Sequence, residues 1–324
     1  MCIFVGERPR AYIWDSMRKL EDLKNGADEM KSAFKQIGFL GVGVMGEPMC
    51  RNLANKCGLP VVVYDTDPAP LERLKTHGAK IVGSVRELVE VSDVIFLSLP
   101  SGEVVHDIAH RKEGLLKYIK PAQIVVDTST SPVNLTRELA KTFAGRGAAF
   151  LDAPIARTRA AAESGTLSVM VGADRELFEK LRPLIATFAS DITLCGPVGC
   201  GQVLKILNNM MLFQIGLAIS EAKAIGVHAG VDATLLFDTL SKGSGDSFAL
   251  RNHGMKAMLP GDYPLRAFSV KYARKDLRYG LQLAEDAHVE ALSARNVDAW
   301  FGKAIDAGYG DQYWPVISRL INRG

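Results

Sequence analysis

The chain has 324 residues, of which 48% are hydrophobic and 23% charged, so it can bury one large core and has room for two. This composition argues against disorder. The 39 Lys and Arg residues barely outnumber the 36 Asp and Glu residues and form no basic run, which favours a small anionic ligand over a nucleic acid. The five cysteines are scattered without metal-binding spacing, as expected for reduced thiols in a cytoplasmic protein.

Residues 1–35 are expected to be an N-terminal extension. They carry six acidic residues and no long apolar core, a composition that fits neither a signal peptide nor an Arg-rich transit peptide. Two interpretations stay open: residues 14–23 form an accessory helix, or Met30 is the native start.

From residue 36 onward, short apolar runs alternate with segments of helical spacing. The expected strands are 37–40, 61–64, 94–97, 124–126 and 149–151. The expected helices are 48–56, 68–77, 84–90, 131–143 and 174–188. This alternation predicts an α/β fold over residues 36–197, a Rossmann-type doubly wound parallel sheet with helices on both faces.

After about residue 195 the strand pattern stops. The segments 201–229, 232–240, 266–284 and 291–308 have helical spacing, so residues 198–324 are expected to form an all-α C-terminal domain. The helix from residue 201 is apolar nearly all round, which predicts that other helices enclose it. Its polar side chains would be costly inside a membrane, which favours a buried helix of a soluble protein.

A glycine-rich turn follows the first predicted strand and opens a helix, within one βαβ unit. In a dinucleotide-binding turn, Gly41 permits the tight bend, Gly43 lets backbone N–H groups approach the pyrophosphate, and Gly46 lets helix and strand pack closely. The candidate cofactor-binding residues of this turn are Gly41, Gly43, Val44, Met45 and Gly46. The alternative is a plain strand-to-helix turn.

Asp65 stands at the end of the next predicted strand, 19 residues beyond Gly46. A carboxylate there would accept hydrogen bonds from the ribose hydroxyls of a dinucleotide and repel a 2′-phosphate. The next residues are Thr66 and Asp67, with no arginine to bind that phosphate. The sequence therefore predicts NAD as the cofactor.

Lys205 is the candidate catalytic acid/base. It shares a helix face with Asn209, four residues on, and Asn208 lies beside them, while the other neighbours are apolar. Loss of water around the ammonium would lower the pKa of the lysine, which suits a group that takes the hydroxyl proton in alcohol oxidation and returns it in reduction. Asn209 could hold the lysine or the reacting oxygen. The alternative is a lysine whose ammonium reaches out to solvent.

Six ordered blocks resemble the signatures of the β-hydroxyacid dehydrogenase family, which includes 3-hydroxyisobutyrate and tartronate semialdehyde enzymes. The blocks are residues 41–49, 97–101, 127–132, 152–155 with 165–172, 199–209 and 275–277. The resemblance runs from about residue 36 to the C-terminus. It implies an NAD-dependent dehydrogenase that interconverts a small β-hydroxyacid and its aldehyde or ketone, with substrate between two domains and dimers or tetramers built on the helical domain.

The resemblance also implies site residues beyond the glycine turn. It places Leu99, Pro100 and Thr130 along the nicotinamide half of the cofactor, and Lys275 near both the nicotinamide and the substrate. For Lys275 the alternative is a solvated charge within the basic stretch 271–278. Asn208 is included as a candidate substrate contact.

The chain departs from the family at the substrate loop. The family commonly has Ser-Gly-Gly, whose serine binds the substrate carboxylate, whereas this chain has Ala156, Arg157 and Thr158. Their place makes these three residues candidate substrate contacts, and their identity puts 3-hydroxyisobutyrate itself in doubt. An Arg-Thr pair suits a sulfonate and resembles the sulfolactaldehyde reductase branch of the family. The alternative is that Arg157 faces solvent or a partner subunit.

Two other functions compete with a dehydrogenase. A non-catalytic binding protein on the same fold would be expected to lose Lys205, and an imine reductase usually carries a different residue there. No metal site is expected, because the paired histidines at 106 and 110 have no third ligand spaced near them.

Overall fold

The computed structural model describes residues 33–265 and 267–321. The expectations for an accessory helix and for a start at Met30 lie outside these residues. The chain divides into two compact units, one running to Ser129 and continuing over Asn134–Gly201, the other combining Thr130–Val133 with the residues from Gln202 onward. The domain boundary expected between residues 197 and 198 remains a prediction, because this division follows a different criterion.

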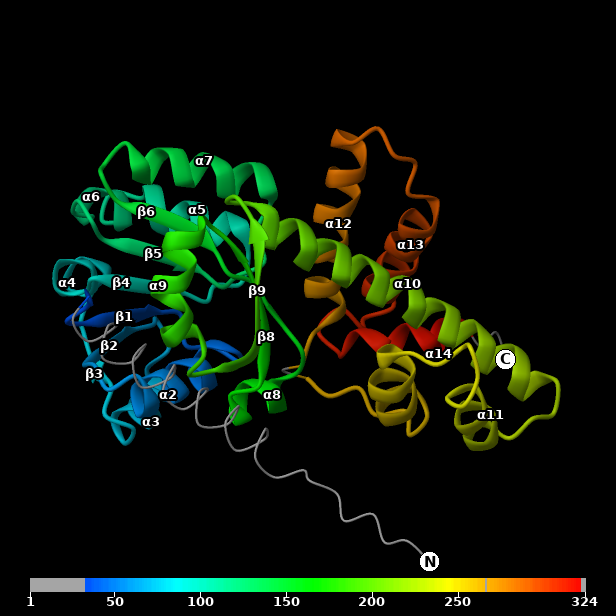
Figure 1. Ribbon diagram of the computed structural model, residues 1–324. Coiled ribbons are helices and arrows are strands. Elements are labelled where there is room, and N and C mark those ends of the chain that lie inside the picture. The colour runs from blue at the N-terminus through cyan, green and yellow to red at the C-terminus, as the bar shows by residue number, and fades with distance from the viewer. Residues whose placement is uncertain (1–32, 266, 322–324) are drawn as a thin grey trace, which may run out of the picture. The chain divides into compact units, whose positions relative to one another are not determined.

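A nine-stranded sheet forms the centre of the first unit (Figure 1). Its order is β3-β2-β1-β4-β5-β6-β8-β7, with β9 paired to β8. The pairs from β3 to β6 are all parallel, and β8 runs antiparallel to β6 and β7. The strands are β1 (Ile37–Leu40), β2 (Val61–Tyr64), β3 (Lys80–Ile81), β4 (Val94–Leu97), β5 (Ile124–Asp127), β6 (Ala149–Asp152), β7 (Ile155–Ala156), β8 (Leu167–Gly172) and β9 (Ala189–Gly196).

Helices cover both faces of this sheet because alternate strand residues point to opposite sides. Ile37 and Phe39 of β1 belong to the core beneath α2 (Gly46–Lys56), α3 (Pro68–Lys75) and α9 (Arg175–Ile185). Leu40 belongs to the opposite core, with Ile95 and Leu97 of β4. That core packs under α4 (Val85–Val91), α5 (Gly102–His110), α6 (Leu115–Tyr118) and α7 (Val133–Ala144). A short helix, α8 (Arg159–Ser164), follows β7.

The second unit is built from helices. The long helix α10 (Cys200–His228) leads into α11 (Ala233–Leu240), the π-helix η1 (Leu250–Met258), α12 (Val270–Asp286), α13 (Leu292–Asp306), the 3₁₀-helix η2 (Trp314–Ile317) and α14 (Ser318–Ile321). Its core centres on Phe213, whose ring meets the rings of Phe301 and Trp314 edge to face. Helix α12 begins later than predicted because the Ser269 side chain accepts a hydrogen bond from Tyr272 N and caps it.

This architecture confirms the predicted Rossmann-type sheet followed by helices. The sequence analysis did not predict β3, β7, β8 and β9, so the sheet is wider and more mixed than expected. The residues of β9 are mostly exposed or half-buried, and Ser190 and Asp191 interrupt its apolar run. A strand exposed along much of its length lacks the continuous apolar pattern of the central parallel strands.

Within residues 33–265 and 267–321, other helices do not fully enclose α10, contrary to the prediction. Met211 is 58% exposed and Ile225 is 69% exposed, and Leu204 and Leu207 also reach the surface. With Ala218, which is exposed as well, positions 204, 211, 218 and 225 recur every seven residues and share one face of the helix. We call these four residues together with Leu207 the α10 stripe.

By length and composition, α10 is the one helix in the described ranges 33–265 and 267–321 that could cross a membrane. A single helix of this kind is weak evidence, since the core helix of a soluble protein meets the same criterion. Polar side chains such as Lys205 and Asn209 lie within it and would be expensive in lipid.

The turn between β1 and α2 depends on glycine at two positions. Gly41 has a φ of +92°, and a Cβ there would lie 2.4 Å from Ser98 O. A Cβ at Gly46 would lie 2.1 Å from Gly41 O, so only glycine allows the helix to start this close to the strand. Gly43 is different, because a Cβ there would meet nothing within 4 Å.

We expect Gly46→Ala to destabilise the protein and Gly43→Ala to leave its stability unchanged. The first substitution forces backbone atoms apart, which costs about 1–3 kcal/mol, whereas the second adds a methyl group in open space and costs less than about 0.5 kcal/mol. Urea denaturation followed by circular dichroism measures both free energies of unfolding. Equal stabilities for the two variants would contradict this account of the turn.

Candidate functional site

The strand order of the first unit reverses between β1 and β4, and the two strands end at the same edge of the sheet. In open α/β sheets the crevice at such a point is where ligands bind. The glycine turn follows β1, Asp65 follows β2, and Leu99 with Pro100 follows β4. Leu99 N donates a hydrogen bond to Ser129 Oγ at 2.9 Å, which ties the β4 turn to the end of β5.

The glycine turn leaves the start of α2 open to an anion. Gly43 and Val44 are exposed, and Met45, at the N-cap, makes no side-chain capping hydrogen bond. The first N–H groups of a helix carry a partial positive charge and bind phosphate. The cradle at Gly43, where a side chain is absent and backbone is reachable, therefore fits the pyrophosphate of a dinucleotide.

The carboxylate of Asp65 is fixed by backbone groups on two sides. Its Oδ2 accepts a hydrogen bond from Val42 N at 2.6 Å, and its Oδ1 accepts one from Asp67 N at 2.8 Å. The first of these bonds links the end of β2 directly to the glycine turn. Asp65 therefore has a defined position beside the turn, where the ribose of a bound dinucleotide would lie.

A hydrogen-bonded chain of side chains surrounds Lys205 in the second unit. Lys205 Nζ donates to Asn209 Oδ1 at 3.1 Å, and Asn208 Nδ2 donates to the same oxygen at 3.2 Å. Asn209 Nδ2 in turn donates to Asp276 Oδ2 on α12 at 2.8 Å. Asn209 thus holds the lysine, as expected from their four-residue spacing.

Burial lowers the pKa of Lys205 to about 8. The nearby Asp276 carboxylate raises the pKa, and the Lys275 ammonium lowers it further, so the value reflects a balance among three effects. An amine with a pKa near 8 exchanges a proton readily at neutral pH. The pKa of Lys205 therefore lies in the range that proton transfer at neutral pH requires.

Lys275 is not the solvated charge that the sequence left open. Its side chain is only 22% exposed, and Nζ lies 2.9 Å from Asp276 Oδ1. The ammonium also sits over the rings of Tyr279 and Tyr272, at 5.2 and 5.8 Å from their centroids. Lys275 therefore belongs to the same charged cluster as Lys205.

Arg157 is partly exposed, with 40% of its side chain open to solvent, so the solvent-facing alternative stays open although neighbouring groups also bind its guanidinium. Its guanidinium donates to Thr166 O at 2.6 Å and Ser190 Oγ at 2.9 Å, and Nη2 lies 2.6 Å from Asp191 Oδ2. A substrate anion would have to compete with Asp191 for this cation. The arginine also has a φ of +87°, at the position where the family commonly has glycine.

The remaining predicted residues lie on loops or at the ends of helices and strands. Ala156 ends β7, Thr158 is the N-cap of α8 without a side-chain capping bond, and Thr130 belongs to the second unit. Among residues 33–265 and 267–321, no group of three or more His, Cys, Asp or Glu side chains could hold a metal ion.

Asp276 is the functional candidate that the sequence analysis did not select. Two signals were available: Asp276 stands in the block 275–277, and it falls on the buried face of α12 with Ala273, Leu277 and Gly280. An acidic residue at a core position of an amphipathic helix requires a partner. Here the partners are Asn209 and Lys275.

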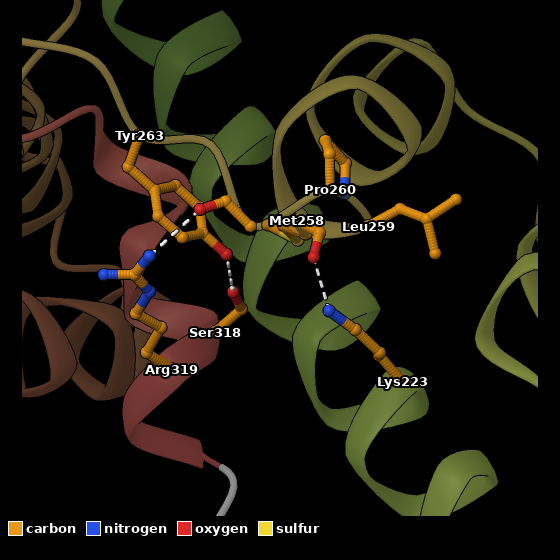
Figure 2. Close-up of a pocket in the computed structure, with 8 residues that line it drawn as sticks. Lys223, Met258, Leu259, Pro260, Tyr263, Ser318 and Arg319 are labelled. Atoms are coloured by element: carbon orange, nitrogen blue, oxygen red, sulfur yellow. Dashed lines mark hydrogen bonds between the residues drawn. The ribbon is translucent and has the colours of Figure 1, made fainter.

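A hollow of about 280 Å³ also opens in the second unit (Figure 2). Its polar groups are mostly engaged: Lys223 donates to Met258 O, Arg319 donates to Gly261 O, and the Tyr263 and Ser318 hydroxyls bond to each other. Lys223 lies 18 residues beyond Lys205 on α10, a rise of about 27 Å. The hollow is therefore separate from the Lys205 cluster.

Two family models cover most of the chain. The first, described as the NAD binding domain of 6-phosphogluconate dehydrogenase, matches residues 36–196. The second, described as the NAD-binding of NADP-dependent 3-hydroxyisobutyrate dehydrogenase, matches residues 199–317. Together they include the glycine turn, Asp65 and the Lys205 cluster.

Individual relatives agree with these models. The chain is 32% identical over 254 residues to 2-(hydroxymethyl)glutarate dehydrogenase of Eubacterium barkeri, covering 78% of this chain and 84% of the relative. It is 32% identical over 293 residues to NAD-dependent L-serine dehydrogenase of Pseudomonas aeruginosa, covering 89% and 98%. The structure of Mycobacterium tuberculosis 3-hydroxyisobutyrate dehydrogenase with L-serine superimposes with a TM-score of 0.78 at 28% identity, covering 90% and 99%.

These matches span both units and agree with the motifs found in the sequence. The glycine turn provides a dinucleotide cradle, and the relatives are dehydrogenases over nearly their full length. The chain therefore belongs to the β-hydroxyacid dehydrogenase family of nicotinamide-dependent oxidoreductases.

Proposed function

We propose that the protein is an NAD-dependent dehydrogenase that interconverts a small β-hydroxyacid and its aldehyde or ketone, with Lys205 as the general acid/base. The observation that carries this proposal is the environment of Lys205. Its pKa is lowered to about 8, and its ammonium donates to Asn209 Oδ1. Among the described residues of the second unit, no other group combines such a pKa with a place in one of the family's signature blocks.

The first unit would hold the cofactor. The pyrophosphate would lie against the backbone of Gly43 and Val44 at the start of α2, and the ribose hydroxyls against Asp65. Leu99, Pro100, Thr130 and Lys275 are assigned to the nicotinamide half by resemblance alone. A bound nicotinamide supplies the hydride acceptor in oxidation and the hydride donor in reduction. The names of the relatives include both NAD and NADP, so the NAD preference rests on Asp65.

Lys205 would manage the proton of the reacting hydroxyl. In the oxidation direction the neutral amine accepts this proton, and in the reduction direction the ammonium returns it to the developing alkoxide. Asn209 orients the amine, because its carbonyl oxygen accepts from Nζ. Asn208 shares that oxygen and stands beside the lysine as a candidate substrate contact.

For the substrate we propose a small β-hydroxycarboxylate, the class named for several relatives. The second candidate is a C3 sulfonate, as in sulfolactaldehyde reductases. It is supported by the Arg157-Thr158 pair in place of the family's glycines and opposed by the engagement of Arg157 with Asp191. Ala156 cannot supply the hydroxyl of the family's serine, so the acid group must be bound by other donors.

The rival functions differ at Lys205. A binding protein without activity needs no lysine of lowered pKa, and an imine reductase usually has another residue there.

Cytoplasmic location is part of the proposal and is supported by the cysteines at 50, 57, 195 and 200, which are free thiols.

We also propose that a second copy of the chain covers the α10 stripe in a homodimer or homotetramer. Apolar side chains that recur every seven residues are the pattern by which helices pack against one another. Large apolar side chains at Met211 and Ile225 are otherwise left in water at a cost.

Lys205→Met should lower kcat by roughly 10²–10⁴-fold and leave NADH binding unchanged, since only proton transfer is removed. In the wild type, the oxidation rate should rise with pH and level off above about 8, while the reduction rate should fall over the same range. Steady-state kinetics and NADH fluorescence titration measure these effects. Lys223→Met, on the same helix, is the control and should keep its kcat. A Lys205→Met enzyme with normal kcat would refute the assignment.

Asp65→Ser should raise the ratio of NADPH to NADH efficiency by about tenfold or more, because a carboxylate no longer opposes the 2′-phosphate. The measurement is kcat/KM with each cofactor. Asp93→Ser is the matched control, since Asp93 accepts backbone hydrogen bonds at the opposite edge of the sheet. If both variants kept the wild-type ratio, Asp65 would not select the cofactor.

A substrate panel separates the two candidate classes. We expect 3-hydroxyisobutyrate, glycerate and L-serine to include the best substrate, with 2,3-dihydroxypropanesulfonate weaker, because Asp191 already neutralises Arg157. NADH formation measured by absorbance gives kcat/KM for each compound. A sulfonate that exceeded all three carboxylates would establish the second candidate instead.

Met211→Glu combined with Ile225→Glu should convert the oligomer to a monomer, since buried carboxylates would face each other across the α10 stripe. Light scattering coupled to size-exclusion chromatography measures the mass. Val91→Glu, at an exposed apolar position of α4, should leave the mass unchanged. A wild-type protein that is monomeric at micromolar concentration would exclude the proposed assembly.

A further inference from the structure

One buried carboxylate connects Lys205 and Lys275. Asp276 on α12 is 3% exposed. Its Oδ2 accepts from Asn209 Nδ2 at 2.8 Å, and its Oδ1 lies 2.9 Å from Lys275 Nζ. Oδ2 is therefore linked to Lys205 through the Asn209 amide, while Oδ1 makes an ion-pair contact with Lys275 and no hydrogen bond.

The chemistry of this carboxylate determines which way the Asn209 amide points. An ionised carboxylate only accepts hydrogen bonds, so the NH₂ group of Asn209 has to face Asp276. The carbonyl oxygen of the same amide must then point the other way, and it receives Lys205 Nζ at 3.1 Å. If the amide were rotated by 180°, its NH₂ group would face the lysine. Only the neutral amine of Lys205 could accept a hydrogen bond from that group, because an ammonium has no lone pair.

We propose that Asp276 is a positioning residue that acts on Lys205 through Asn209. It fixes the amide so that an acceptor faces the lysine, and its negative charge offsets the cost of a protonated amine in this buried place. The inference deepens the proposed function and rests on it, because it concerns how the general acid/base is oriented and kept in balance between its two protonation states.

The charged groups around Lys205 predict in which direction the loss of Asp276 would change the pKa of the lysine. Within the second unit, Asp276 and Lys275 on α12 are the charged groups that act on Lys205, and its neighbours Asn208 and Asn209 on α10 are neutral. The carboxylate raises the pKa of Lys205, whereas burial and Lys275 lower it. Without the carboxylate, both remaining effects act in the same direction.

Asp276→Asn tests the proposal without any cofactor or substrate. Acetic anhydride acetylates a neutral amine but not an ammonium, so the labelling rate of Lys205 as a function of pH gives its pKa, read by mass spectrometry of the peptide. The wild-type midpoint is expected near pH 8. In Asp276→Asn we expect it to move down by about one pH unit or more. The pH profile of alcohol oxidation should move down with it.

A double substitution distinguishes a specific effect of Asp276 on Lys205 from simple misfolding of the variant. Asn209→Asp combined with Asp276→Asn keeps the net charge and the hydrogen bond between the two positions, but it places the carboxylate directly beside Lys205. The labelling midpoint should then rise above that of the wild type, the opposite of the single variant. Asp298→Asn is the matched control: it removes an acid bound to Arg274 and Arg278, and the Lys205 midpoint should stay near 8.

The outcomes separate this proposal from the proposed function. An Asp276→Asn midpoint equal to that of the wild type, or a double substitution that lowers the midpoint, would overturn the role of Asp276 while leaving Lys205 as the acid/base. Full activity of Lys205→Met would overturn the proposed function, whatever the labelling shows. A lowered midpoint in Asp276→Asn and a raised one in the double substitution would support the positioning role.

Discussion

An ammonium that is removed from water must lose its proton or be given compensating charge, and the second unit is arranged around that constraint. Burial pushes the proton off Lys205, and Asp276 holds it on. For the proposed acid/base role both effects are needed together. Their balance depends on α10 and α12 being packed so that Asn209 and Asp276 stay within hydrogen-bonding distance. The aromatic core around Phe213 and the cap at Ser269 would then serve the proposed chemistry as well as the stability.

The first unit solves a different problem, that of bringing backbone close to a polyanion. Glycine at positions 41 and 46 allows the helix and the strand to pack very closely, while the backbone at Gly43 stays exposed. Asp65 is anchored on the same turn through Val42 N. Because this hydrogen bond joins the turn to the carboxylate, a displacement of β2 relative to β1 would disturb the glycine turn and Asp65 together.

Much of this could be predicted from the sequence because it depends on local rules. The parallel strands, the glycine turn and the spacing of Lys205 and Asn209 follow from short-range patterns, and the fold was confirmed. Strand β9 was missed because an exposed strand lacks a continuous apolar run, whereas the apolar residues 169–171 of the buried strand β8 were a signal that the sequence analysis did not use. The exposure of the α10 stripe and the role of Asp276 could not be predicted, since each depends on which helix lies opposite, and residue spacing along one helix does not contain that information.

The arginine at position 157 has a consequence for the behaviour of its loop in salt. Its left-handed backbone is a fixed cost of about 1–3 kcal/mol, independent of ionic strength. The contact with Asp191 that helps to hold it is half exposed and is screened as salt rises. At high salt the hydrogen bonds to Thr166 O and Ser190 Oγ then stabilise the strained backbone with a smaller contribution from the ion pair. The loop after β7 should accordingly be the first part of the sheet edge to loosen in concentrated salt, and with it the place where the acid group of the substrate is expected.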